Sequence, residues 1–432
     1  MDKNILIERL NAGTKELRLE ALRGLKKLLD TGDIDSPVQQ GCTNNHVHTK
    51  YSFSPYSPSM AVWMAFMSGL STVGIIDHDA VNGSEEFIEA GKILGIATTC
   101  GFEIRTDWSA TSLKGKRINN PDQISSAYIC AHGLPYTQIE KADAFLAPIR
   151  SARAKRNRAM TEKLNELTKP HGIVIDYDSE VLPLSYAAFG GEVTERHMLY
   201  ALSMKITQKL GKGPAVASFV SDSLRIPLSE KQKEFLADAG NEAYEYDLLN
   251  ILKGSFVSNI YIDADTRETP QIAGTVEFIK QLGAIPTYCY LGDVGASPTG
   301  DKKAQKFEDD YLEDVFEECR KIGFQAIAFM PSRNTKQQLK RVMALCGRYG
   351  FMQISGEDIN QPRQSFVCQE LKDDEFAHLI DSTWALVGHE KIAARDINKG
   401  IFAAEPLSAA VISERIKTYS RIGLGDNQEE MK

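Results

Sequence analysis

The chain has 432 residues, of which 42% are hydrophobic and 25% charged, and its formal net charge is −8. This composition excludes disordered, collagen-like and low-complexity classes, and the length allows a large core without disulfides. The acidic balance argues against a broad nucleic-acid-binding surface but allows a local basic pocket. The seven cysteines are scattered without a C-x-x-C pair, so neither a disulfide framework nor a zinc-thiolate site is expected. No apolar run approaches about 18 residues, so we expect a cytoplasmic protein with no membrane partner.

The first 40 residues predict a helical extension. Leu22, Leu25 and Leu29 follow helical spacing, and Asp30-Thr31-Gly32 ends the pattern. We expect this helix to pack on the outside of the main domain.

A β/α rhythm follows, in which helical stretches end at a glycine and a short apolar run comes next. A glycine can take the left-handed conformation that closes a helix, and apolar runs bounded in this way are typical of parallel strands buried on both faces. The predicted strands are residues 45–48, 72–77, 96–103, 127–132, 284–290, 324–330 and 351–355. The sequence therefore predicts an α/β fold, a seven-stranded β/α barrel formed by residues 41–136 and 266–368.

Two helical regions complete the predicted organisation. Residues 137–265 interrupt the rhythm with long runs of helix-forming residues, which indicates a helical insertion subdomain over one end of the barrel. Residues 369–432 are helical again and form a C-terminal extension.

Histidine and carboxylate side chains fall at the ends of the predicted strands. In chain order they are His46 and His48, His78, Glu103, His132 and Asp358. Each alone has a structural explanation, such as an ion pair between Glu103 and Arg105 or a buried core histidine at 132. Together they suit a metal centre, because β/α barrels collect their active sites at the carboxyl ends of the strands, and neutral imidazoles with carboxylates bind Zn²⁺, Mn²⁺ or Fe.

At these positions the chain resembles the PHP (polymerase and histidinol phosphatase) family, within it the stand-alone metal-dependent phosphoesterases. The matching motifs are N-H-V-H-T (45–49), G-I-I-D-H-D-A-V-N-G (74–83), G-F-E-I (101–104), Y-I-C-A-H-G (128–133), V-T-E-R-H-M-L-Y-A-L (193–202) and S-G-E-D-I-N (355–360). The resemblance covers residues 41–368. It implies a distorted seven-stranded β/α barrel that binds two or three divalent ions, Mn, Zn or Fe, and hydrolyses phosphate esters.

The resemblance also implies a ligand for each ion. His46, His48, Glu103 and Asp358 would hold the first, and Glu103 would bridge to a second held by His132 and His197. His78 and Asn360 would belong to the third.

At three places the sequence departs from the family pattern, and these departures weaken the binding site expected for the third metal ion. Phe53 replaces an aspartate, Asn360 replaces a histidine, and Tyr288-Cys289-Tyr290 replaces A-H-P. A neutral amide brings no charge to a cation, so we expect two tight ions. His78 would then be released for acid–base catalysis.

Four arginines are candidates for bidentate contact with a phosphate group, namely Arg156, Arg196, Arg333 and Arg363. The expected function is hydrolysis of a small phosphorylated metabolite or nucleotide by a metal-activated water, with His78 and Arg196 as catalytic residues. Two alternatives remain open. One is an amidohydrolase-like enzyme for a non-phosphate substrate, and the other is a metal-binding PHP-like module that has lost turnover.

Overall fold

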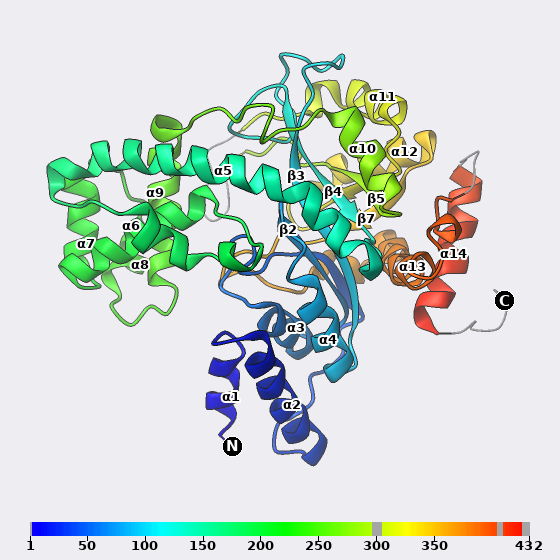
Figure 1. The fold of residues 1–432 in the computed structure, drawn as a ribbon, viewed down its shortest axis with the longest axis horizontal. Helices are drawn as coiled ribbons and strands as arrows, with labels where there is room; N and C mark the ends of the chain where they lie inside the picture. The colour runs from blue at the N-terminus through cyan, green and yellow to red at the C-terminus, as the bar shows by residue number, and fades with distance from the viewer. Residues whose placement is uncertain (1, 296–304, 404–408, 426–432) are drawn as a thin grey trace.

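The computed structural model describes residues 2–295, 305–403 and 409–425, and at its centre a seven-stranded sheet curves into a nearly closed barrel (Figure 1). The strands, paired in chain order, are β1 (Cys42–Val47), β2 (Leu70–His78), β3 (Ala97–Asp107), β4 (Ser126–His132), β5 (Ile285–Cys289), β6 (Ala326–Phe329) and β7 (Met352–Ser355). A bridge between Val47 and Ile359 brings the end of β1 beside the segment that follows β7. The predicted α/β fold and seven-stranded barrel are confirmed.

The expectation that every strand is parallel is wrong for β4, which pairs antiparallel with both β3 and β5. The remaining pairs are parallel. A loop of turns joins β3 directly to β4, with Asp107 opposite Ser126, whereas a parallel pair needs a crossover connection. The carboxyl end of β4, where His132 lies, therefore points to the opposite end of the barrel from those of the other strands.

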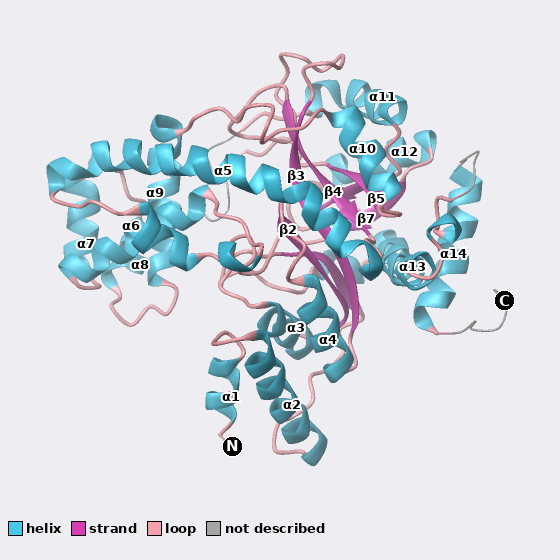
Figure 2. Cartoon of the chain, viewed as in Figure 1, coloured by secondary structure: helices cyan, strands magenta, loops and turns pink. Residues whose placement is uncertain are grey.

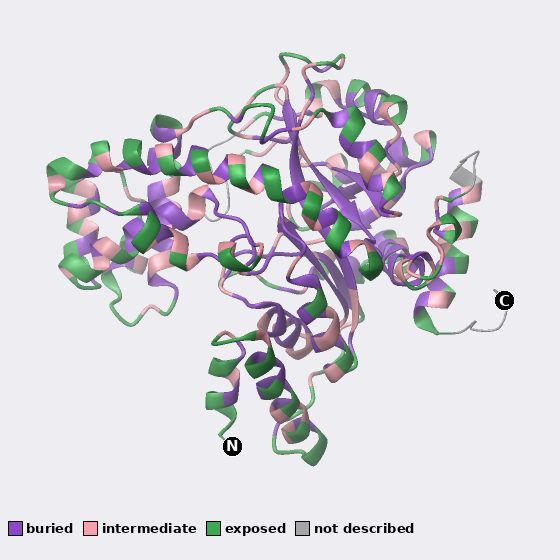
Figure 3. Ribbon diagram, in the orientation of Figure 1, coloured by how far each residue is buried: buried purple, intermediate pink, exposed green. Residues whose placement is uncertain are grey.

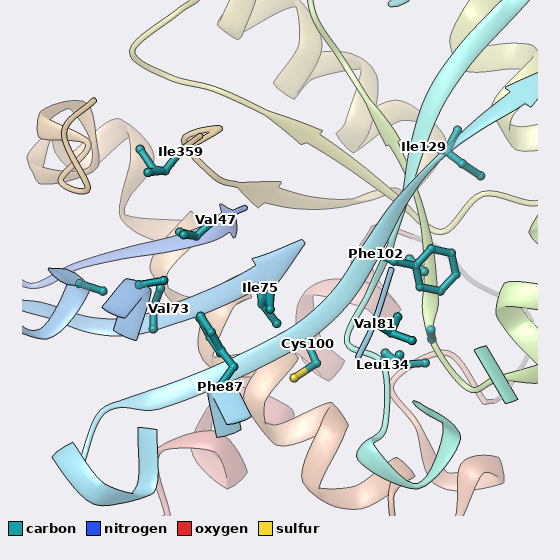
Figure 4. Close-up of a cluster of buried hydrophobic side chains, with 14 of the residues drawn as sticks. Val47, Val73, Ile75, Val81, Phe87, Cys100, Phe102, Ile129, Leu134 and Ile359 are labelled. Carbon is teal, nitrogen blue, oxygen red and sulfur yellow. The ribbon is translucent and has the colours of Figure 1, made fainter. Parts of the chain in front are cut away.

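Helices cover the outside of the barrel (Figure 2). They are α3 (Pro58–Met67), α4 (Ser84–Leu94), α10 (Ile272–Gln281), α11 (Leu312–Ile322) and α12 (Lys336–Tyr349). Gly95, Gly323 and Gly350 close three of these helices in the left-handed conformation, as the sequence predicts. Figure 4 shows part of the core that lies between strands and helices, where Val73 of β2 approaches Phe87 of α4.

The two ends of the chain pack against different parts of the barrel. Helix α2 (Lys15–Thr31) lies against α4, where buried Arg18 forms a 2.6 Å ion pair with Glu86, and α1 (Lys3–Arg9) packs on α2. Helices α13 (Ala377–Ala393) and α14 (Ala409–Leu424) pack together, and α13 also contacts β1, β3 and β7. Thr383 of α13 accepts a hydrogen bond from Asn45 of β1, and His389 lies 2.9 Å from the carbonyl of Gly283, just before β5. Helix α13 therefore covers the end where the parallel strands begin.

Residues between β4 and β5 form a group of helices with a hydrophobic core of its own, drawn on the left of Figure 1. They are α5 (Ile139–Thr168), α6 (Glu195–Leu210), α7 (Pro214–Ser218), α8 (Glu230–Ala237) and α9 (Tyr244–Ile260). Figure 3 shows buried residues on their inward faces and exposed residues outside. Phe53 of the barrel enters this core. The boundaries of the individual domains stay a prediction.

Within the described ranges, no helix combines the length and the apolar character needed to cross a bilayer.

Candidate metal centre

Side chains from β1, β2, β3 and the segment after β7 converge near the end of the barrel where the parallel strands finish. Glu103 lies within β3, which continues to Asp107 and does not end at residue 103 as the sequence predicts. The nitrogen, oxygen and sulfur atoms at this end form overlapping groups, in each of which the atoms lie within 4.8 Å of one another. The groups are His46, His48 and Asp358; His48, His78 and Glu103; and His46, Glu103 and Cys130. This is the type and spacing of donors that a divalent metal ion needs.

Strand register explains the convergence. His78 pairs with Glu103 in the ladder between β2 and β3, so the two side chains project on the same side of the sheet. The His48 amide donates to the carbonyl of Ile359, and the Ile359 amide donates to the carbonyl of His46. These two bonds hold Asp358 beside the end of β1.

Glu103 lies at the centre of the cluster. Its Oε2 atom is 2.9 Å from Nδ1 of His78, 3.8 Å from Nε2 of His46 and 4.0 Å from Nε2 of His48. Burial raises the pKa of Glu103, but the three imidazoles outweigh burial and hold the pKa at about 2. Asp358, 3.2 Å from Nε2 of His48, likewise has its pKa held well below the usual value by that imidazole despite burial. Both carboxylates are therefore ionised at neutral pH.

Several atoms of the cluster are buried without a hydrogen bond. Nε2 of His48 and Nδ1 of His78 have no hydrogen-bond partner among the described residues, although carboxylate oxygens lie close to both. Buried polar atoms are rarely left in this state unless a ligand completes them. The donor set and these uncompensated atoms fit a divalent ion held by His46, His48, Glu103 and Asp358.

A hydrogen-bond chain that the motif analysis missed orients His48. Nδ1 of His48 lies 3.1 Å from the Ser52 hydroxyl, which donates to Asp77 at 2.6 Å. Asp77 also accepts bonds from the amide and hydroxyl of Thr49, both at 2.6 Å. Such a partner fixes the tautomer and ring orientation of a metal-binding imidazole. The sequence feature that could have indicated this hydrogen-bond chain is Asp77, the first aspartate of D-H-D (77–79).

His132 lies outside these groups of ligand atoms in the described part of the chain. It is at the far end of antiparallel β4, where burial and the charge on His46 lower its pKa to about 3. Cys130, on the same face two residues earlier, is the residue opposite Glu103. The structure thus brings Cys130 into the cluster.

His197 and Asn360 have other immediate contacts. His197 lies in the first turn of α6, where its Nδ1 accepts a hydrogen bond from the Thr194 amide, and its ring meets Phe53 edge-on at 4.9 Å. Burial lowers its pKa to about 3. The Asn360 amide donates to Asp358 at 2.7 Å, so it contacts a residue of the cluster directly.

The four predicted phosphate-binding arginines lie in different surroundings. Arg196 stacks over Phe53 and helps to lower the pKa of Asp358, which places it beside the cluster. Arg156 is buried in ion pairs with Glu268 and Glu195, at 2.7 and 2.8 Å. Arg363 forms an ion pair with Asp247 at 2.8 Å, and the Arg333 side chain donates a hydrogen bond to the Leu291 carbonyl at 3.2 Å.

Comparisons with known proteins give partial matches. No family model matches the chain. A 5'-3' exoribonuclease of Haemophilus influenzae is 28% identical over 153 residues, which is 35% of this chain and 47% of the exoribonuclease. The chain therefore matches about half the length of that relative.

Among solved structures, a protein of Bifidobacterium adolescentis provisionally described as a metal-dependent phosphoesterase has a TM-score of 0.51 and 20% identity. The match covers 80% of this chain and 96% of that protein, and it supports the barrel fold. An amidohydrolase of Chromobacterium violaceum has a TM-score of 0.49 and 16% identity over 74% of this chain and 88% of its own. That similarity is too distant to support a conclusion about this chain.

Proposed function

We propose that this chain is a PHP-type metal-dependent phosphoesterase that hydrolyses a small phosphorylated metabolite or nucleotide. The observation that carries the proposal is the convergence of His46, His48, Glu103 and Asp358 at the end of the barrel that α13 leaves uncovered. We propose two divalent ions, drawn from Mn, Zn and Fe. When bound, such ions lower the pKa of a water molecule and offset negative charge on phosphoryl oxygens.

The protein residues have separate tasks in this proposal. Glu103 lies between the imidazoles and offsets the repulsion between two dications. Ser52 and Asp77 keep His48 in one orientation. Arg196 holds the phosphate group of the substrate, since a guanidinium matches phosphate oxygens in geometry and charge.

His78 is proposed to protonate the leaving oxygen. Its side chain is 25% exposed, against 12% for His46 and 2% for His48, so it is the most open of the three to an incoming substrate. With Nδ1 facing Glu103, Nε2 is the atom left to deliver the proton.

The relatives agree with phosphate-ester chemistry. The name of the Haemophilus relative describes an enzyme that acts on RNA, a phosphodiester, and the Bifidobacterium protein is provisionally described as a metal-dependent phosphoesterase. All seven cysteines are free thiols, which is consistent with our proposal of a cytoplasmic location.

The test combines metal analysis of purified protein with phosphate release from monoesters, nucleotides, bisphosphates and short oligonucleotides. We expect about two ions per chain and release from one of these classes. Hydrolysis confined to amides or lactones would replace the proposal with the amidohydrolase alternative. Bound ions without turnover of any substrate would indicate the metal-binding module.

A further inference from the structure

Two cysteine thiols meet on the inner wall of the barrel beside the metal cluster. Sγ of Cys289 on β5 lies 3.2 Å from Sγ of Cys130 on β4. Sγ of Cys130 in turn lies within 4.8 Å of ligand atoms of His46 and Glu103. The scattered spacing of the cysteines offered no reason to expect this pair, because the two residues are 159 positions apart in the chain.

The antiparallel direction of β4 brings the thiols together. Cys130 is opposite Glu103 on one neighbouring strand and opposite Thr287 on the other. On β5, the side chain of Tyr288 points away from the barrel interior, where its hydroxyl donates to buried Glu308 at 3.0 Å. Because side chains alternate along a strand, Cys289 points to the interior.

Other buried cysteines of the chain lie in different surroundings. Cys319 and Cys346 belong to the hydrophobic core between the barrel and its outer helices. Cys130 is equally buried but has a carboxylate and an imidazole as neighbours. Carboxylate and imidazole are the side chains that share divalent ions with thiolates, whereas the core thiols have apolar neighbours.

We propose that Cys130, with Glu103 and His46, forms a sulfur-bearing position of the metal centre that selects Zn²⁺ over Mn²⁺, and that Cys289 supports the Cys130 sulfur from the neighbouring strand. The inference depends on the proposed function only in that the centre holds ions. As the sulfur–metal bond forms, the S–H bond of Cys130 breaks and its proton passes to solvent. Soft thiolate ligands favour zinc, whereas carboxylate and carbonyl oxygens suit manganese.

The ligand atoms of Cys130, Glu103 and His46 already lie within 4.8 Å of one another. Cys289 adds a thiol 3.2 Å from the Cys130 sulfur. His48 and Asp358, whose Nε2 and carboxylate oxygen lie 3.2 Å apart, remain for the other ion and offer only nitrogen and oxygen. The two positions of the centre would then prefer different metals.

Cobalt substitution tests this proposal without any activity measurement. Co²⁺ bound by thiolate gives an intense near-ultraviolet charge-transfer band, which nitrogen and oxygen ligands do not give. We expect this band in the Co²⁺-loaded wild-type protein, together with release of one proton from the Cys130 thiol. Full Co²⁺ occupancy without the band would overturn the proposal, and this result needs no variant.

Alanine variants then separate the ligand from its partner. Cys130→Ala should remove the band and reduce zinc affinity by at least about 100-fold, whereas Cys289→Ala should keep a weaker or shifted band and reduce zinc affinity by about 10- to 100-fold, the usual cost of losing an indirect partner. Manganese affinity of the other position should change little. Cys346→Ala, which removes an equally buried thiol in the core, should keep the band and both affinities. An unchanged preference for zinc in both site variants would contradict the assignment.

Failure of this inference and failure of the proposed function give different results. Two bound ions and phosphate release without a thiolate band would refute the sulfur position and leave the phosphoesterase intact. A thiolate band without hydrolysis of any phosphate ester would support the sulfur position and refute the enzyme.

Discussion

Nδ1 of His78 lies 2.9 Å from Oε2 of Glu103, and the two residues are direct partners in the parallel ladder between β2 and β3. Strand pairing therefore fixes the contact before any ion is present. Glu103 has imidazoles on several sides, and its ionised carboxylate is the common element of two ligand groups. The roles of these two residues can be separated by mutation.

Glu103→Gln should remove ion binding and turnover together. The change deletes the negative charge that offsets two neighbouring dications while it conserves shape. We expect ion affinity to fall by at least about 100-fold, measured by elemental analysis after dialysis, and phosphate release to fall to background. Glu357→Gln is the matched control, because that carboxylate accepts a hydrogen bond from Ser332 and lies outside the ligand groups among described residues. Retention of two tight ions by Glu103→Gln would exclude a bridging role.

His78→Ala should reduce turnover and leave two tight ions in place. A proton donor acts on the barrier of the reaction, with typical contributions of 10²- to 10⁴-fold, and has little effect on ion affinity. The measurement is kcat together with ion content. His171→Ala, in the helical region away from the cluster, should change neither quantity. Loss of one ion from the His78 variant, or three tight ions in the wild type, would instead make His78 a ligand of a three-ion centre.

Arg153→Met should destabilise the chain strongly. Arg153 of α5 is 2% exposed and forms ion pairs with Asp79 after β2, at 2.8 Å, and with Glu195 of α6, at 3.2 Å. Its removal takes the ion pair away from buried Asp79, while Glu195 keeps its pair with Arg156, so we expect a loss of about 3–5 kcal/mol in the free energy of unfolding.

Arg158→Met on the same helix provides the control. Arg158 pairs with Asp178 at 2.6 Å, but both side chains are about half exposed. Exposed pairs contribute about 0.2–1 kcal/mol. Urea denaturation of both variants measures the contrast, and equal costs would mean that Arg153 does not hold the helical region to the barrel.

Stability should fall as the pH drops below about 6.5, in part because of His389. Its Nδ1 accepts from the Ile401 amide at 3.0 Å and its Nε2 donates to the Gly283 carbonyl at 2.9 Å, a pattern that requires the neutral ring. Burial lowers its folded-state pKa to about 4. Between pH 6.5 and pH 4 the unfolded chain therefore binds the extra proton, and stability decreases by roughly 2 kcal/mol.

Urea midpoints at pH 7 and pH 4.5, measured for metal-free protein, check this expectation. In His389→Gln the slope with pH should be smaller, although other buried histidines still contribute to it. The prediction fails if wild type and variant lose the same free energy over this interval.

The seven strands and most residues of the cluster could be predicted from local sequence patterns. Gly95 and Gly350 end helices, and apolar runs follow them. Both features depend on neighbouring residues in the chain, so they can be recognised in the sequence. The positions of His46, His48 and Asp358 at strand ends then follow, because parallel strands finish at one end of the barrel.

Which residues of β4 and β5 reach the cluster depends on how the strands pair in the folded barrel. The direction of β4 depends on pairing with strands at both sides, a long-range choice that periodicity does not encode. The register with β3 places Cys130, not His132, opposite Glu103, and alternation on β5 turns Cys289 toward it. The arginines were equally beyond sequence reasoning, since burial of Arg156 against Glu268 depends on how the helical region folds onto the barrel.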